Sequence, residues 1–225
     1  MTFYVYRSDK SAGADELVKA LKATRLRQSN LGSQEFHRGD VIVCWGARIQ
    51  KIPAGVRVLN NTQLLDKLGQ IEVLRNGNVP TVELLDSEEW IHRRFEHVDG
   101  DDLLKPYAES GFWVKKEALA AEYRVHIFDG LSIRAGVKVP FRENAHPWIH
   151  PFHAGWRINC DNFHSTELMR TVAKDAVQAL HLQFGAVDVG ERKDGSYLVL
   201  EVNRSPGIEN ENTMKTYADA FRGWA

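Results

Sequence analysis

Two patterns of hydrophobic and polar residues alternate along the first 78 residues. Short apolar runs predict strands, and apolar residues three or four apart predict helices. The expected strands are 3–7, 41–45 and 56–59. One helix is expected at 15–26, with Leu17, Val18, Leu21 and Leu26 on one face. A second helix is expected to begin after Asn61 or Thr62 as its N-cap and to end at 76–80. Strands that alternate with helices predict a small parallel sheet with helices packed against it.

From residue 81 onward the pattern predicts short strands, a hairpin and two further helices. Apolar and polar residues alternate at 123–128 and 133–139, on either side of an Asp129-Gly130 turn. An amphipathic helix is expected at 166–182 with Ser165 as its cap, and a last helix at 212–221. The stretch 140–156 has no period, so we expect a long loop near the functional site.

A second hairpin carries the strongest chemical signal. Its strands are apolar runs at 185–190 and 197–203, and an Asp194-Gly195 pair lies between them. If that pair is a two-residue turn, Asp188 lies directly opposite Glu201 on one face of the sheet. Carboxylates that face each other directly across a sheet repel.

Alternation places Asn203 on the same face as the two carboxylates. The residues expected to point the other way, into a core, are Leu198, Leu200 and Val202. Two carboxylates and an amide oxygen are ligands that suit Mg²⁺, which would relieve the repulsion. The alternatives are a solvated carboxylate face without an ion, and a three-residue loop at 193–195 that would offset the facing pair by one residue.

The preceding hairpin also carries charged residues on one face. Alternation places Glu122, Arg124 and His126 together. On the next strand Arg134, Gly136 and Lys138 share a face, so Lys138 could join Arg124 in the same cleft. An exposed, charged face of a two-sided hairpin is the alternative interpretation.

Bulk properties are those of an ordinary globular protein with one or two domains. The chain has 225 residues, is 43% hydrophobic and 26% charged, and has a net charge of -1, which gives no reason to expect nucleic acid or a membrane as partner. The two cysteines, Cys44 and Cys160, lack metal-binding spacing. Neither a signal peptide nor a membrane span is visible, so we expect a cytoplasmic protein.

The histidines of the 140–156 stretch raise the alternative of a zinc site. His146, His150 and His153 have spacings that would suit a helix, but Pro147 and Pro151 interrupt it. Histidines of a substrate-binding loop are therefore the favoured interpretation.

Three segments carry a resemblance to a known family. Glu201-Val-Asn203-Arg-Ser-Pro-Gly207, preceded by Asp188, resembles the metal-binding end of ATP-grasp ligases. Glu122-Tyr-Arg-Val-His126 with its hairpin is similar to the matching segment of RimK-like and phage-associated ATP-grasp proteins. Asp66-Lys67-Leu68, followed by Asn78-Val-Pro80, is similar to the family segment in which a lysine reaches nucleotide phosphate.

The resemblance implies an α/β (α+β) chain with the ATP-grasp fold. A small N-terminal parallel α/β domain would span 1–78, a small central lobe 79–118, and a C-terminal lobe with the metal site 119–225. The two α+β lobes would enclose ATP between them.

The resemblance also implies roles for individual residues. The metal ligands would be Asp188, Glu201 and Asn203, holding two Mg²⁺ ions; the nucleotide would be contacted by Lys67, Glu122 and the hinge residues Trp113, Val114 and Lys115. The catalytic residues would be Arg124, Lys138 and Gly207, and the substrate would be bound by Arg142, Arg157, Arg204 and Ser205. Where many relatives have a lysine before the phosphate loop, this chain has Arg93 and Arg94, and the choice between them stays open.

The activity implied is ATP-dependent ligation of a carboxylate to an amine through an acyl phosphate, with release of ADP and phosphate. The substrates would be small molecules or peptides. The alternatives are an ATP-dependent phosphotransferase on the same fold and a nucleotide-binding or interaction module without turnover. The oligomeric state does not follow from the sequence.

Overall fold

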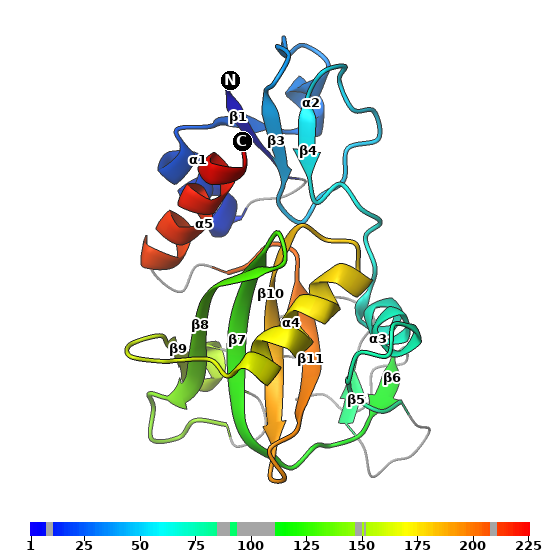
Figure 1. Cartoon of the computed structure of the whole chain (residues 1–225), viewed down its shortest axis with the longest axis vertical. Helices are drawn as coiled ribbons and strands as arrows, with labels where there is room; N and C mark the ends of the chain where they lie inside the picture. Colours follow the sequence, from blue (N-terminus) through cyan, green and yellow to red (C-terminus); the bar gives the residue numbers. More distant parts are fainter. Residues whose placement is uncertain (8–10, 85–90, 94–110, 147–149, 151, 208–210) are drawn as a thin grey trace.

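The computed structural model describes residues 1–7, 11–84, 91–93, 111–146, 150, 152–207 and 211–225 (Figure 1). The N-terminal sheet is parallel, with strand order β2-β1-β3-β4. Its strands are β1 (Phe3–Tyr6), β2 (Thr24–Leu26), β3 (Val41–Cys44) and β4 (Arg57–Leu59), and its helices are α1 (Ala12–Leu21) and α2 (Gln28–Leu31). The predicted parallel sheet is confirmed.

The larger sheet is antiparallel, with strand order β11-β10-β7-β8-β9. Its strands are β7 (Leu119–Phe128), β8 (Leu131–Pro140), β9 (Trp156–Asn159), β10 (Phe184–Arg192) and β11 (Tyr197–Asn203). Helix α4 (Glu167–Ala179) crosses one face (Figure 1), and α5 (Glu211–Trp224) packs against β8 and α1. The Asp129-Gly130 turn between β7 and β8 has φ angles of 47° and 76°, as a two-residue hairpin requires.

Helix α3 (Lys67–Asn76) and a two-stranded ladder lie beside the β11 edge of the large sheet (Figure 1). The ladder consists of β5 (Ile91–Arg93) and β6 (Phe112–Val114), and a short 3-10 helix, η2 (Phe152–Ala154), precedes β9. The mixed α/β fold agrees with the predicted class. The division into 1–78, 79–118 and 119–225 stays a prediction. No helix in the described part of the chain is long and apolar enough to cross a membrane.

Two helix ends differ from the prediction. Leu26 was expected in the first helix, but α1 ends where Lys22 adopts a left-handed conformation (φ 55°) and caps the preceding turn. Leu26 then pairs with Tyr6 in the parallel sheet and is fully buried. Helix α4 is capped by Thr166 rather than by Ser165, because the Thr166 hydroxyl accepts the backbone N–H three residues on.

The start of α3 was also predicted too early. Neither Asn61 nor Thr62 is its N-cap; Asp66 is, with its carboxylate accepting the Gly69 N–H at 2.7 Å. The Asn61 amide instead pairs with both backbone groups of Ile49, at 2.7 and 3.1 Å. A tertiary contact thus uses the side chain that local sequence suggested for capping.

The N-terminal sheet and the large sheet are joined by an apolar core and a polar latch. The core brings β1, β3 and α1 together with α5, Phe128 and Phe184. The latch is the side chain of Asn60, a fully buried residue at the end of β4. Its Oδ1 accepts the N–H groups of Gln183 (2.8 Å) and Phe184 (3.1 Å), and its Nδ2 donates to the Phe184 carbonyl (2.7 Å). The beginning of β10 is thereby fixed to the N-terminal sheet.

Candidate active site

The β10–β11 hairpin brings Asp188 opposite Glu201, as predicted. The predicted two-residue turn is wrong, however, because the loop between Arg192 and Ser196 has three residues. It is closed by the Arg192 N–H to the Ser196 carbonyl (2.8 Å) and by the Gly195 N–H to the Arg192 carbonyl (2.9 Å). Gly195 has a φ of 81°, the left-handed conformation that such loops place on glycine.

A β-bulge restores the register before the carboxylate pair. Val189 pairs with Val199, one residue out of step with the carboxylate pair, so Leu200 is the extra residue on β11. Because of the bulge, the prediction that Leu198, Leu200 and Val202 share one core face is wrong. Leu198 and Leu200 pack with residues of α3 and β6, whereas Val202 belongs to the core beneath α4.

Two cations from neighbouring strands hold the Asp188 carboxylate. Arg124 lies directly across on β7, with Nε 2.7 Å from Oδ1 and Nη2 3.0 Å from Oδ2. Lys138 on β8 donates to Oδ2 at 3.1 Å. The side chains of Arg124, Lys138 and Asp188 are only 18, 10 and 11% exposed. Arg124 and Lys138 therefore lie together, as predicted, but a register shift between His126 and Ile127 that was not predicted is needed to put them on one face. Their catalytic role stays a prediction.

Glu122 is the fourth charged member of this cluster, after Arg124, Lys138 and Asp188. Its Oε2 accepts from Lys138 at 3.0 Å, and the Nδ1 atom of His150 lies 2.8 Å from Oε1. The His150 ring lies against the ring of Trp156, with centroids 3.8 Å apart. The predicted loop at 140–156 thus reaches the site through His150.

The members of the cluster stabilise each other's charged forms. Burial alone would raise the pKa of Asp188, but Arg124 and Lys138 lower it on balance. Burial would also raise the pKa of Glu122, and there Lys138 and His150 produce a net decrease. Burial acts to lower the pKa of Lys138, whereas Asp188 and Glu122 raise it overall. The cluster is therefore a set of ionised groups at neutral pH.

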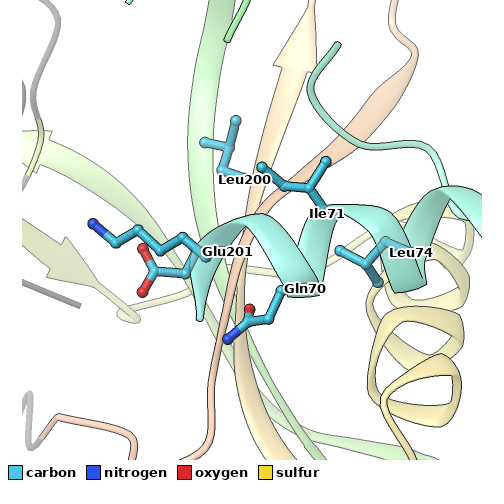
Figure 2. Close-up of a pocket in the computed structure, with 6 residues that line it drawn as sticks. Gln70, Ile71, Leu74, Leu200 and Glu201 are labelled. Atoms are coloured by element: carbon cyan, nitrogen blue, oxygen red, sulfur yellow. The ribbon is translucent and has the colours of Figure 1, made fainter. Parts of the chain in front are cut away.

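A small pocket borders Glu201 on the side of α3 (Figure 2). Its lining residues are Lys67, Gln70, Ile71, Leu74, Leu200 and Glu201. Lys67, the residue predicted to approach nucleotide phosphate, is buried, and it lines this pocket together with Glu201, a predicted metal ligand. Gln70 was not singled out from the sequence; its Oε1 accepts the Val202 N–H at 3.2 Å. Its position three residues after Lys67, on the same face of α3, is the signal that was available.

The residues predicted along the nucleotide lie in the small ladder. Trp113 and Val114 belong to β6, and Lys115 follows it. The Lys115 N–H already donates to the Glu83 carbonyl at 3.0 Å, and its Nζ lies 3.4 Å from the Glu83 carboxylate. Arg93 ends β5, while its alternative, Arg94, lies outside the described residues, so the choice between them stays open.

Arg204, predicted to bind substrate, contacts the backbone between the N-terminal sheet and α3. Its Nη1 donates to the Gln63 carbonyl at 2.7 Å, and its Nη2 to the carbonyls of Asn60 (3.0 Å) and Thr62 (3.3 Å). These contacts make it a connector between β11 and that segment, and its substrate role stays a prediction.

The other predicted substrate and oxyanion groups lie at the edges of the described site. Ser205 is exposed and borders Gly46 so closely that a Cβ there would be 2.9 Å from the Ser205 hydroxyl. Arg142 lies over a neighbouring aromatic ring, Arg157 is exposed on β9, and Gly207 is exposed. Their predicted roles are not decided by these positions.

The predicted metal ligands offer only oxygen atoms, from two adjacent strands. Asp188 faces Glu201, and Asn203 follows Glu201 at the next position but one. This donor set fits Mg²⁺ chemically. Repulsion between the carboxylates does not by itself require a metal, since Arg124 and Lys138 already neutralise Asp188. No group of three or more His, Cys, Asp or Glu side chains suited to a metal occurs within the described residues, which leaves the zinc alternative without support there.

The sequence that forms most of this site matches the model of a known protein family. Residues 80–205 match the family model of an ATP-grasp domain, the third family of its clade. The match covers more than half of the chain, so the chain belongs to this ATP-grasp family and the predicted resemblance to ATP-grasp ligases is confirmed. The likeness to RimK-like and phage-associated proteins stays a resemblance. No curated protein sequence matches the chain significantly.

Solved structures with the same fold extend the likeness to the whole chain. The ATP-grasp ligase PsnB complexed with a minimal precursor has a TM-score of 0.72 at 13% identity, covering 100% of this chain and 99% of that one. D-alanine–D-alanine ligase from Bacillus anthracis complexed with ATP has a TM-score of 0.68 at 15% identity, covering 99% and 96%. D-cycloserine synthetase DcsG has a TM-score of 0.60 at 17% identity, covering 100% and 99%. At these identities the likeness establishes the fold.

Proposed function

We propose that this ATP-grasp protein is an ATP-dependent ligase that joins a carboxylate to an amine. The observation that carries the proposal is the facing pair Asp188 and Glu201, set beside the buried cations Arg124 and Lys138 in a member of this family. A site with oxygen ligands for metal and cations for phosphate is what phosphoryl transfer needs.

Asp188, Glu201 and Asn203 would hold Mg²⁺, for which we propose two ions. When bound, Mg²⁺ neutralises charge on the polyphosphate and on the transferred phosphoryl group. A PsnB structure contains Mg and ADP, and the D-alanine–D-alanine ligase structure contains ATP, which supports a nucleotide site of this kind here.

The protein's own groups would position the substrates and stabilise charge. Lys67, in the pocket beside Glu201, would approach a phosphate, and Arg124 and Lys138 would approach the γ-phosphoryl group. The backbone N–H groups of the turn that ends at Gly207 would point at the substrate carboxylate and its oxyanion. Glu122 would hold the ribose.

The reaction proceeds in two displacements. A carboxylate oxygen of the first substrate attacks the γ-phosphorus of ATP, the bond to the bridging oxygen breaks, and ADP leaves. The amine nitrogen then attacks the acyl carbon, loses a proton, and expels phosphate as the amide forms. One PsnB structure and the structure of a macrocyclase, MdnC, which has a similar fold (TM-score 0.59), each contain a precursor peptide, which supports including peptides as well as small molecules among the candidate substrates.

The test is phosphate release and product mass measured over a panel of carboxylates and amines with Mg²⁺ and ATP. The proposal expects phosphate and a condensed product only when both substrates are present, and turnover reduced by about 100-fold or more in Glu201→Gln. ADP formed with a carboxylate alone and a stable phosphorylated product would establish a phosphotransferase instead. Nucleotide binding without turnover across the panel would establish a binding module.

A further inference from the structure

Both oxygens of the Asp188 carboxylate are already engaged by protein cations. Arg124 contacts Oδ1 at 2.7 Å and Oδ2 at 3.0 Å, and Lys138 contacts Oδ2 at 3.1 Å. An ionised carboxylate has about four lone-pair sites, so roughly three are occupied. With the side chain only 11% exposed, water has little access to the remainder. A metal ion that binds Asp188 therefore competes with these contacts for the carboxylate oxygens.

Of the two cations, Lys138 can leave Asp188 with the smaller loss of ion-pair contacts. It is shared between Asp188 at 3.1 Å and Glu122 at 3.0 Å, so it keeps an acidic partner when it leaves Asp188. Its flexible stem carries a compact charge that can shift without a new backbone position. Arg124, by contrast, holds Asp188 through two parallel hydrogen bonds from the directly opposite strand position.

The charges of the cluster balance before any ligand enters. Asp188 and Glu122 carry two negative charges, and Arg124 and Lys138 carry two positive ones, all on side chains no more than 18% exposed. A divalent cation arriving alone would add two positive charges beside two poorly solvated cations, where repulsion is screened weakly, against the one further negative charge of Glu201 opposite Asp188. A polyphosphate arriving with the metal supplies new anionic partners for Arg124 and Lys138.

We propose that Lys138, with Arg124, holds the place of the metal on Asp188, so that a divalent cation binds this carboxylate only together with the nucleotide. The inference rests on the proposed function, because it takes Asp188 as a metal ligand. Lys138 then has two successive partners: Asp188 in the free protein, and phosphate once the metal–nucleotide complex is bound. Metal entry and phosphate binding become one coupled event.

The test measures Mn²⁺ binding to the full chain by electron paramagnetic resonance, without nucleotide. Lys138→Met should bind Mn²⁺ at least tenfold more tightly than the wild type, while Lys138→Arg, which keeps the charge, should stay within about twofold of it. The gain should vanish in Lys138→Met combined with Asp188→Asn. Circular dichroism confirms folding, and Lys138→Gln serves if Lys138→Met does not fold.

A second titration, with a non-hydrolysable ATP analogue present, separates the two ways of failing. If Asp188→Asn does not weaken Mn²⁺ binding there, Asp188 is no metal ligand, and both the metal assignment and this inference are overturned. If Asp188→Asn does weaken it, but the nucleotide-free wild type binds Mn²⁺ as tightly as Lys138→Met, only the place-holding role of Lys138 is overturned.

Discussion

Replacing Asn60 by glycine tests whether the N-terminal sheet and the catalytic hairpin are held together by one buried amide. Asn60 has a left-handed backbone (φ 56°), which glycine adopts without strain, so the substitution removes the side chain alone. Three hydrogen bonds to the backbone of Gln183 and Phe184 are lost. The backbone N–H of Asn60, which donates to the Gln183 side chain at 2.6 Å, is retained.

The expected loss follows from the groups left behind. Two N–H groups and one carbonyl at the start of β10 lose their partner, and Phe184 is fully buried. Each buried group left unpaired costs about 1–3 kcal/mol, so the free energy of unfolding should fall by roughly 3–9 kcal/mol. For a chain of this size 1 kcal/mol corresponds to about 2–4 °C, which gives a decrease in Tm of roughly 6 °C or more.

Thermal unfolding followed by circular dichroism and calorimetry measures the effect. Asn162→Gly is the matched control, because Asn162 has a similar φ of 54° but is exposed. Its replacement should lower the free energy of unfolding by no more than about 1 kcal/mol. Equal decreases in Tm for the two variants would refute the reasoning, because backbone entropy and not the buried amide would then set the effect.

Three further predictions concern the site. Gly136→Ala should lower the free energy of unfolding by about 2 kcal/mol, because a Cβ there would lie 2.8 Å from the Asn159 carbonyl oxygen; an unchanged Tm would contradict this. Glu122→Gln should cost about 3 kcal/mol at pH 7. Because the folded-state pKa of Glu122 is lowered, the difference in free energy of unfolding between wild type and Glu122→Gln is fully present above about pH 4.3 and is lost as the pH falls through the folded-state pKa. Urea unfolding of both proteins should therefore show a smaller difference at pH 3 than at pH 7. An equal difference at the two pH values would contradict the role of the ionised carboxylate. Glu201→Gln should reduce amide formation by about 100-fold or more while leaving the circular dichroism spectrum unchanged, and near-normal turnover would remove Glu201 from the metal site.

Part of the charged cluster could be predicted, because residues two apart on one strand share a face. Lys138 reaches the face of Arg124 only through a register shift between His126 and Ile127, however; continued from the two-residue Asp129-Gly130 turn, the register would place Lys138 on the opposite face. The same reasoning placed Asp188 opposite Glu201. Here two errors compensated each other, since the longer loop and the bulge shift the register in opposite directions.

What could not be predicted depends on contacts between residues far apart in the chain. Asn61 is a residue type favoured at helix N-caps, yet its side-chain amide pairs with the backbone of Ile49. The sequence likewise indicated unrelieved repulsion at Asp188, because it does not show that cations 50 and 64 residues away reach that carboxylate. The contact of His150 with Glu122 belongs to the same class, as no local period orders the segment that carries it.

The extra residue in β11 has a consequence for what the hairpin can present. In a regular strand neighbouring residues face opposite ways, yet Leu200 and Glu201 border the same pocket (Figure 2). The strand thus sets an apolar wall immediately beside an acidic group, an arrangement that strict alternation forbids. Deleting Leu200 would give an unbroken ladder with Asp188 still opposite Glu201, and it would leave Ile71 and Leu74 as the apolar lining of the pocket. The extra residue is therefore not needed for pairing; what it adds is an apolar side chain from β11 itself, next to the Glu201 carboxylate.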